Sequence, residues 1–342
     1  MGITLQQAIW RVAGQTWAFE DVANLLIAML TGRWTLLAGL PGVGKSTFAR
    51  SVLTRLGHGP TTGRTLELVV RRDWQDDAPL FGFWHPTERR WEPSSEGLLE
   101  HLLRARDDAD KRLGGLYPVL IEELNLASPE HYLARLLSAT EASPPRLRLY
   151  GPDLHPENQT RYPASFELPA STRLVATVNV DDTVERLSPR FLSRASVIWI
   201  EPRAGAPRWR PEDDLIDAPP VSLPALFASV DRPPAPLGTL EGVIEHLRGL
   251  GLPGAPSRRT VVAMGRALAA SEGVLPRIEA EDQQLLQRVL PPLRGVGPKW
   301  RALLDELSVR FEAGGWRRSA AHTRALRERG EALGDWYDLF HT

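Results

Sequence analysis

Short aliphatic runs alternate with amphipathic stretches from about residue 34 to residue 200. A strand buried on both faces of a parallel sheet reads as a nearly continuous aliphatic run, whereas a covering helix repeats its apolar residues every three or four positions. The alternation therefore predicts an α/β fold, with a parallel sheet and flanking helices. The predicted strands are residues 34–38, 66–70, 119–121, 174–178 and 197–200.

Helical spacing of apolar residues marks residues 5–12, 19–29 and 129–141. The first two segments lead directly into the first predicted strand, so we expect any target to be met by the α/β domain itself or by a partner chain. In the third, Leu133, Leu136, Leu137 and Thr140 are predicted to face inward, and Glu130, Arg135 and Glu141 outward.

Proline becomes dense between residues 201 and 236, which disfavours long helices and central strands there. We interpret 201–236 as a linker between an α/β domain at 1–200 and a smaller, all-helical domain at 237–342. In the second domain, helical spacing recurs at residues 240–247, 285–290, 300–311 and 323–333, and a further helix starts near Ser257.

The composition narrows the class of protein. With 41 basic and 42 acidic residues, the chain has no overall attraction toward nucleic acid or anionic lipid. The absence of cysteine excludes thiol catalysis, zinc–cysteine sites and iron–sulfur clusters, and it suits a reducing compartment. Because no leader-like or long apolar segment is visible, we expect a cytoplasmic protein without membrane contact.

A glycine-rich run lies between the first predicted strand and an amphipathic helix, where it is typical of a phosphate-binding loop. Its glycines let backbone amides turn toward phosphates at a helix N-terminus. Lys45 is expected to reach the β- and γ-phosphates, and the Ser46 hydroxyl to bind Mg²⁺. The run, a Walker A motif, comprises Gly39, Leu40, Pro41, Gly42, Val43, Gly44, Lys45, Ser46 and Thr47, and it predicts a P-loop nucleoside-triphosphatase.

Two acidic residues, Glu122 and Glu123, follow the third predicted strand, as in a Walker B motif. Glu122 is expected to hold Mg²⁺ through a water, and Glu123 to polarise the water that attacks the γ-phosphate. A strand that merely ends in surface carboxylates is the alternative, and the upstream loop favours the catalytic interpretation. Glutamate at the first position, where aspartate is more usual, leaves open a nucleotide-gated scaffold with little turnover.

Polar residues after the fourth predicted strand complete the candidate site. Asn179 is placed to sense the γ-phosphate, the alternative being an amide that caps a loop. Ser188 and Pro189 predict a helix start, and Arg190 and Arg194 are then expected on one helix face. Arg194 has the character of an arginine finger for a neighbouring subunit, and a solvated helix face is the alternative for both arginines.

Two segments resemble AAA+ ATPases related to McrB, the motor subunit of modification-dependent restriction systems, a branch that neighbours the dynein-related and MoxR groups. They are EELNLASPEHYLARLLSATE at residues 122–141 and TVNVDDTVERLSPRFLSRA at residues 177–195. Residues 70–74 and 79–84 resemble the segment that follows the second strand in that family. Glu122 and Leu126 depart from the family pattern, which indicates a divergent branch.

The resemblance implies a hexameric-type ring with active sites between subunits, completed by Arg194 and by a sensor-two arginine at Arg258 or Arg259. It also implies a separate effector, a McrC-like nuclease in restriction or antiviral defence, with DNA met through that partner or the pore. A MoxR-like remodelling chaperone is the alternative. ATP is the favoured nucleotide and GTP remains open. Residues 143–168 could form a pore-facing hairpin or a surface loop.

Overall fold

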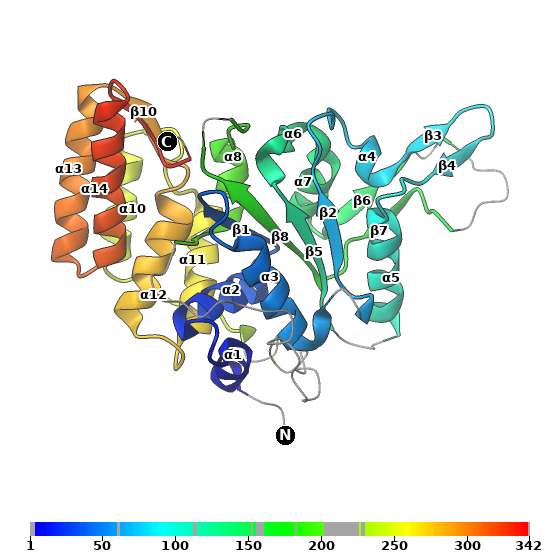
Figure 1. Cartoon of the computed structure of the whole chain (residues 1–342), viewed down its shortest axis with the longest axis horizontal. Coiled ribbons are helices and arrows are strands. Elements are labelled where there is room, and N and C mark those ends of the chain that lie inside the picture. The colour runs from blue at the N-terminus through cyan, green and yellow to red at the C-terminus, as the bar shows by residue number, and fades with distance from the viewer. Residues whose placement is uncertain are drawn as a thin grey trace.

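The computed structural model describes residues 4–59, 62–111, 115–151, 153–154, 161–181, 183–201, 226 and 230–340. A five-stranded parallel sheet in the order β2-β5-β8-β1-β9 forms its centre (Figure 1). Every predicted strand is therefore confirmed. The strands are β1 (Trp34–Gly39), β2 (Leu66–Val69), β5 (Tyr117–Glu122), β8 (Thr172–Asn179) and β9 (Ala195–Trp199).

Because the strands are parallel, the residues of the candidate site lie at one edge of the sheet. β1 is buried throughout, and β8 is buried up to its last residue, which explains their continuous aliphatic character. Gly39, at the end of β1, pairs with Asn179, at the end of β8. Glu122 ends β5, the other neighbour of β8. The loop after β1 and the polar residues after β5 and β8 thus share the carboxyl edge.

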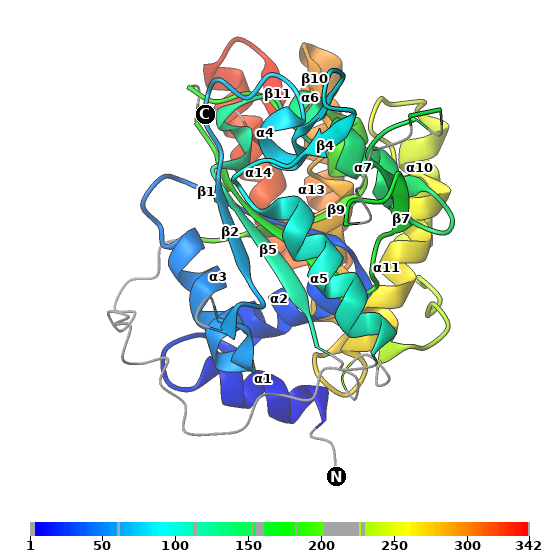
Figure 2. The ribbon, with the colours of Figure 1, turned by 90° about the vertical axis from the view of Figure 1, so that its right-hand side faces the viewer.

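Helices flank the sheet, with α3 in front of it in Figure 1 and α5 prominent when the molecule is turned (Figure 2). The helices at 5–12 and 19–29 are confirmed as α1 and α2. The helices up to β9 are α1 (Leu5–Ala13), α2 (Phe19–Thr31), α3 (Lys45–Leu53), α4 (Ala78–Phe81), α5 (Leu98–Asp110), α6 (Pro129–Tyr132), α7 (Ala134–Glu141) and α8 (Pro189–Leu192). Two shorter helical turns are η1 (Thr54–His58) and η3 (Leu124–Leu126).

The helix expected at 129–141 differs from its prediction in two ways. It breaks at Leu133, whose φ of −100° and ψ of 4° lie outside the helical range and separate α6 from α7. Arg135 and Glu141 do not simply face solvent: Arg135 binds Asp77 at 2.7 Å, and Glu141 binds arginines of other elements. Apolar periodicity identified the inner face correctly but could not show which charged side chains meet the outer one.

Two antiparallel hairpins extend the core. β6 (Arg146–Arg148) pairs with β7 (Ser165–Glu167), which agrees with the hairpin of the two alternatives left open for residues 143–168, without showing where it faces. β3 (Phe83–His85) pairs with β4 (Arg90–Glu92), was not predicted, and projects at the right of Figure 1. Gly82 starts this second hairpin at φ 91°, where an added Cβ would lie 1.9 Å from the Glu92 carbonyl oxygen. Only glycine fits there, because both its conformation and its space exclude a side chain.

A helical region follows residue 230 and lies beside β9, at the left of Figure 1. It was expected to be all-helical, but it also contains a two-stranded sheet, in which Gly295 packs so closely on the Trp300 ring that a Cβ would not fit. Its elements are α10 (Leu240–Gly249), α11 (Arg258–Ser271), α12 (Arg277–Gln284), η5 (Leu285–Val289), β10 (Arg294–Val296), α13 (Pro298–Ala313), α14 (Arg317–Ala332) and β11 (Trp336–Asp338).

Buried polar contacts join this region to the sheet domain. Arg288 of η5 donates to the Ser196 hydroxyl of β9 at 2.7 Å, and Gln287 donates to Asn24 of α2 at 2.9 Å. The predicted linker at 201–236 lies mostly outside the described residues. Within the described part of the chain, no helix has the length and apolar character needed to span a membrane.

Candidate active site

The loop between β1 and α3 has a backbone that only glycines allow. Gly42 and Gly44 have φ values of 79° and 92°, and no atom lies within 4 Å of a Cβ added at either position. Gly39 is needed for space instead, because a Cβ there would lie 2.5 Å from the Ile200 carbonyl oxygen. The glycines therefore reverse the chain and bring it close to β9, leaving the loop's concave backbone accessible.

Lys45 places its ammonium group inside the loop. Its Nζ donates to the carbonyl oxygens of Gly39 at 2.9 Å and Leu40 at 2.8 Å, and the side chain is buried. Burial lowers the pKa of Lys45, while the nearby carboxylates of Glu123 and Asp181 act in the opposite direction. The predicted phosphate-binding lysine and the predicted catalytic carboxylate thus lie close enough to influence each other.

Glu123 is held in a tight turn after β5. Its φ of 53° and ψ of 47° are left-handed, a conformation that costs a non-glycine residue roughly 1–3 kcal/mol and persists only when its surroundings impose it. Its N–H donates to the Thr177 hydroxyl at 2.9 Å. The Asn125 side chain also donates to the Asn179 carbonyl at 2.9 Å and accepts from the Asn179 N–H at 3.1 Å. These bonds fix Glu123 relative to the end of β8.

No role was predicted for Asn125 or Thr177, although the position of each in the sequence indicates a buried polar side chain. Thr177 is a buried hydroxyl residue within the aliphatic run 174–178 of β8. Asn125 is a buried amide just after the paired glutamates. Buried polar side chains need hydrogen-bond partners, so each position pointed to a specific contact.

Glu122 lies between the candidate metal site and a cation. Its Oε1 forms a short ion pair with Arg50 of α3, and the Arg50 Nε lies 3.1 Å from Glu67. Arg50 was not predicted to take part, yet it is one helical turn beyond Ser46 and therefore shares that side of α3. The structure thus brings Glu122 to the helix that begins with the phosphate loop.

Arg194 lies at the opposite edge of the sheet from the loop. It precedes Ala195, which starts β9 and pairs with Trp34 at the start of β1. The loop follows Gly39, five residues further along β1, which corresponds to roughly 16 Å at about 3.3 Å per residue. Arg194 is therefore remote from the phosphate loop of its own chain.

The helix expected to carry both arginines is shorter than predicted. Ser188 caps α8 as expected, its hydroxyl accepting from the Phe191 N–H at 3.1 Å, but α8 ends at Leu192. Arg194 follows that end and forms an ion pair with Glu141, leaving 10% of its side chain exposed. Arg190 is 81% exposed and lies 3.9 Å from the same carboxylate.

Arg258 and Arg259 begin α11, which confirms the predicted helix start at Ser257. Arg259 donates to Glu141 at 2.9 Å and so lies beside Arg194. Arg259 is therefore remote from the phosphate loop of its own chain. The N-terminus of α11 approaches the end of α7 instead, at the amino edge of the sheet.

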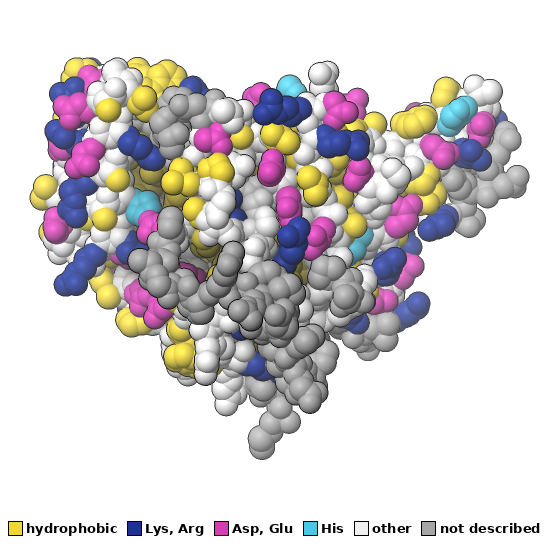
Figure 3. Space-filling model, in the orientation of Figure 1, with side chains coloured by type: hydrophobic (Ala, Val, Ile, Leu, Met, Phe, Trp, Pro, Cys, Tyr) yellow, Lys and Arg dark blue, Asp and Glu magenta, His cyan; other side chains and the backbone are white. Residues whose placement is uncertain are grey.

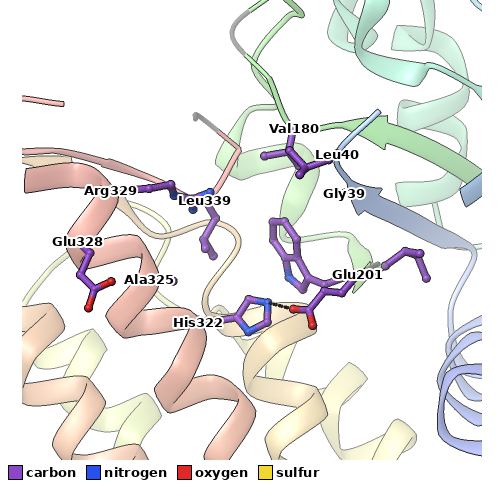
Figure 4. A pocket seen from close by; sticks show the side chains of 11 residues that line it. Gly39, Leu40, Val180, Glu201, His322, Ala325, Glu328, Arg329 and Leu339 are labelled. Atoms are coloured by element: carbon purple, nitrogen blue, oxygen red, sulfur yellow. Dashed lines mark ion pairs between the residues drawn. The ribbon is translucent and has the colours of Figure 1, made fainter. Parts of the chain in front are cut away.

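Most of the side chains that approach the loop from the helical region come from α14. A cavity of about 410 Å³ adjoins Gly39 and Leu40 and is lined on its other side by His322, Ala325 and Arg329 (Figure 4). Their spacing of three and four residues places them on one face of α14, which the sequence pattern contained but could not orient. The cavity has the size and the apolar lining of a site for a small ligand. It is further lined by Val180, Trp199, Ile200, Glu201, Glu328 and Leu339.

The polar residues of this cavity have environments altered by burial. His322 Nε2 lies 3.3 Å from Glu201, and its Nδ1 lies 3.1 Å from the Arg318 carbonyl oxygen. Burial lowers the pKa of His322, with the Glu201 carboxylate opposing that shift. Burial also lowers the pKa of Arg329, and Asp338 opposes it. A loop for phosphates and an adjacent cavity for an apolar ring system together fit a nucleotide.

Residues 35–195 match the family described as the AAA domain of the dynein-related subfamily. The chain carries an AAA+ domain. No curated protein has a significant sequence match to the chain. A solved structure from Cytophaga hutchinsonii, whose ATPase assignment is provisional, is similar at 15% identity and a TM-score of 0.49, over 84% of this chain and 86% of that one.

The oxygen donors of this AAA+ domain fit a magnesium ion. Mg²⁺ prefers hard oxygen ligands and retains several waters, so one hydroxyl and a carboxylate acting through water can suffice beside nucleotide phosphates. Ser46 supplies a hydroxyl at the start of α3, and Arg50 binds one oxygen of Glu122, leaving the other for a metal-bound water. The described residues contain no cluster of three or more histidine, aspartate or glutamate side chains arranged for a metal.

Replacing Arg329 with alanine is expected to weaken nucleotide binding by about ten- to a hundredfold, since hydrogen bonds to a charged group contribute about 1.5–3 kcal/mol. Arg329 lines the cavity beside the loop of the AAA+ domain. Titration with a fluorescent nucleotide measures the effect. Arg324→Ala is the matched control, because Arg324 of the same helix pairs with Glu312 at 2.8 Å outside the cavity. Equal affinity of the two variants would remove Arg329 from the nucleotide site.

Proposed function

We propose that this AAA+ domain hydrolyses a nucleoside triphosphate, with ATP the favoured nucleotide, in a hexameric-type ring of identical chains. The observation that carries this proposal is the separation of Arg194 from its own phosphate loop across the sheet. An arginine at that edge can meet a nucleotide only when a second copy brings one to it. A ring supplies such a contact for every copy, because head-to-tail interfaces close by rotation.

The residues have distinct roles in the proposed reaction. The backbone amides of the loop and Lys45 bind the phosphates, and Ser46 and Glu122 hold Mg²⁺, which neutralises charge on the β- and γ-phosphate oxygens. Glu123 orients the attacking water and accepts its proton, while Asn179 contacts the γ-phosphate. Arg194 of the neighbouring copy stabilises the charge that develops on the transferred phosphoryl group.

We further propose that the ring drives a separate effector, a McrC-like nuclease of a restriction or antiviral defence system, in the cytoplasm. The resemblance of residues 122–141 and 177–195 to McrB-type ATPases supports this assignment. DNA would be met through that partner or through the pore. On the face shown in Figure 3, acidic and basic side chains are interspersed, which agrees with the balanced overall charge.

We expect the chain to assemble when it binds a slowly hydrolysed nucleotide analogue with Mg²⁺. Light scattering coupled to size-exclusion chromatography measures the mass with and without the analogue. Lys45→Ala is the control, since it removes the ammonium that binds the phosphates. A wild-type chain that remains monomeric at saturating analogue would contradict the ring.

The effector is tested by purifying the chain with the protein encoded next to its gene. A nuclease that binds the ring and cuts DNA only during hydrolysis is the expected result. Stable association with a metal-binding protein of the von Willebrand type, without cleavage, would instead favour the MoxR-like remodelling function.

A further inference from the structure

Glu141, the last residue of α7, forms ion pairs with three arginines. Arg194 forms a short ion pair with its Oε1, Arg259 of α11 donates to the same oxygen at 2.9 Å, and Arg190 lies 3.9 Å from Oε2. Burial alone would raise the pKa of Glu141, but the bond from Arg259 and the charges of the arginines lower it. The carboxylate is therefore a charged counter-ion, and it joins the sheet domain to the helical region.

The cluster opens into a polar cavity of about 580 Å³ at the amino edge of the sheet. Arg33 and Arg173 of its wall donate to backbone carbonyl oxygens, so both already take part in hydrogen bonds within the fold. The lining holds more positive than negative side chains, so an anion would be attracted into it. The charged lining residues are Arg33, Arg173, Arg194, Arg259, Arg266, Glu141 and Asp231.

We propose that Glu141 is a positioning residue that holds Arg194 and Arg259 together as a clamp for the terminal phosphate of a nucleotide bound to a second copy of this chain. The inference rests on the proposed ring function and adds two assignments to it. Arg259, predicted from the sequence as a sensor-two arginine without a choice of subunit, acts across the interface. Glu141, expected to face solvent, prepares both arginines.

The geometry supports action across the interface for Arg259. Arg259 shares one carboxylate oxygen with Arg194, so both guanidinium groups lie at the same edge, remote from the loop after Gly39. Arg259 is also the more accessible of the two, with 58% of its side chain exposed against 10% for Arg194. An approaching phosphate would meet Arg259 first, while Arg194 forms the inner part of the clamp.

Electrostatics explains why a carboxylate is needed at the centre. Two guanidinium groups that face one phosphate repel each other before it arrives, and each long side chain would otherwise occupy many rotamers. Glu141 offsets the repulsion and restricts both side chains. Glu141 and the nearby Glu130 do not neutralise the whole cluster, because three arginines, Arg190, Arg194 and Arg259, stand against these two carboxylates. The remaining positive charge stays available to the phosphate.

The first test compares Glu141→Gln with Glu141→Asp. The glutamine keeps the shape but loses the charge, so kcat is expected to fall about ten- to a hundredfold because the arginines lose their alignment. KM should change little, since the nucleotide is bound by the other chain's loop. Aspartate should restore part of kcat. Unchanged melting temperature and ring size would exclude simple misfolding. A glutamine variant as fast as the wild type, or faster, would overturn the proposal, because Glu141 would then be idle or in competition with the phosphate.

The second test assigns Arg259 to one side of the interface by mixing inactive variants. Arg259→Ala retains Glu123, and Glu123→Gln retains Arg259. In a mixed ring, both groups can act on the same nucleotide only if Arg259 reaches the nucleotide bound to the neighbouring chain. Mixing is then expected to give hydrolysis several-fold above either variant alone. Arg194→Ala mixed with Glu123→Gln is the parallel experiment for the ring itself.

The outcomes distinguish the clamp from the ring. Recovery in both mixtures supports the clamp. Recovery with Arg194→Ala but not with Arg259→Ala overturns the clamp and leaves the ring intact. Recovery in neither mixture overturns the proposed ring, and the clamp with it. Full activity of Arg259→Ala by itself also overturns the clamp.

Discussion

Replacing Glu123 with glutamine is expected to slow nucleotide hydrolysis by roughly 10²–10⁴-fold, the usual contribution of a positioned general base. The amide keeps the size of the side chain but cannot accept the proton of the attacking water. Nucleotide affinity should persist, because Lys45 and the loop amides that bind the phosphates are unchanged. Steady-state phosphate release and a nucleotide titration measure the two properties separately.

The control for this prediction is Glu92→Gln, the same substitution at the exposed β3–β4 hairpin. It should leave the hydrolysis rate unaltered. If the Glu123→Gln variant also hydrolyses at the wild-type rate, Glu123 is not the catalytic carboxylate and the site needs another base. A wild-type protein with negligible turnover in the assembled state would favour the nucleotide-gated scaffold, for which the Arg50–Glu122 ion pair offers a structural reason.

The sheet and the phosphate loop could be predicted because their determinants are local in sequence. A strand such as β1 is buried on both sides, so most of its residues are aliphatic or aromatic, and a glycine-rich loop directly follows it. The end of each parallel strand then places Glu122, Glu123 and Asn179 near Gly39 without further information. Chain order and strand direction were sufficient for this half of the site.

The other half depends on contacts between distant segments. Glu141 lies 118 positions before Arg259, and periodicity along α7 said only that the glutamate was not on the apolar face. The meeting of α7, α8 and α11 is a consequence of tertiary packing. For the same reason the sequence could not show at which edge of the sheet Arg259 lies, or that Arg329 of α14 lines the cavity beside the loop.

The β3–β4 hairpin shows a different limit. Each strand has three residues, too few for an alternating pattern to be recognised. Gly82 carries the decisive requirement through its φ of 91° and the proximity of the Glu92 carbonyl. Neither property is visible in a glycine read from sequence alone.

Two buried histidines, His58 of η1 and His101 of α5, should make the fold sensitive to acid. His58 is 3% exposed and His101 is 4% exposed. Among the described residues, neither ring nitrogen of His58 has a hydrogen-bond partner, and Nε2 of His101 also lacks one. Burial lowers the pKa of both to about 4, assisted by the positive charge of Arg64 for His58 and of Arg104 for His101.

A histidine whose pKa is about 6.5 when unfolded and about 4 when folded takes up a proton more readily in the unfolded chain. The stability that each neutral, buried histidine contributes is therefore fully present above pH 6.5 and is lost as the pH falls toward 4. At pH 5 each histidine is expected to reduce the free energy of unfolding by about 2 kcal/mol, a large fraction of the 5–15 kcal/mol typical of a domain.

Urea unfolding at several pH values tests this effect in the wild type and in a His58→Gln, His101→Gln double variant. The variant can be less stable at pH 7, so the informative quantity is the change between pH 7 and pH 5, which should be about 4 kcal/mol smaller than in the wild type. His131→Gln, at an exposed position of α6, should retain the wild-type dependence. If the double variant and the wild type lose equal stability on acidification, the two buried rings are not what makes the fold acid-sensitive, and its carboxylates must be responsible instead.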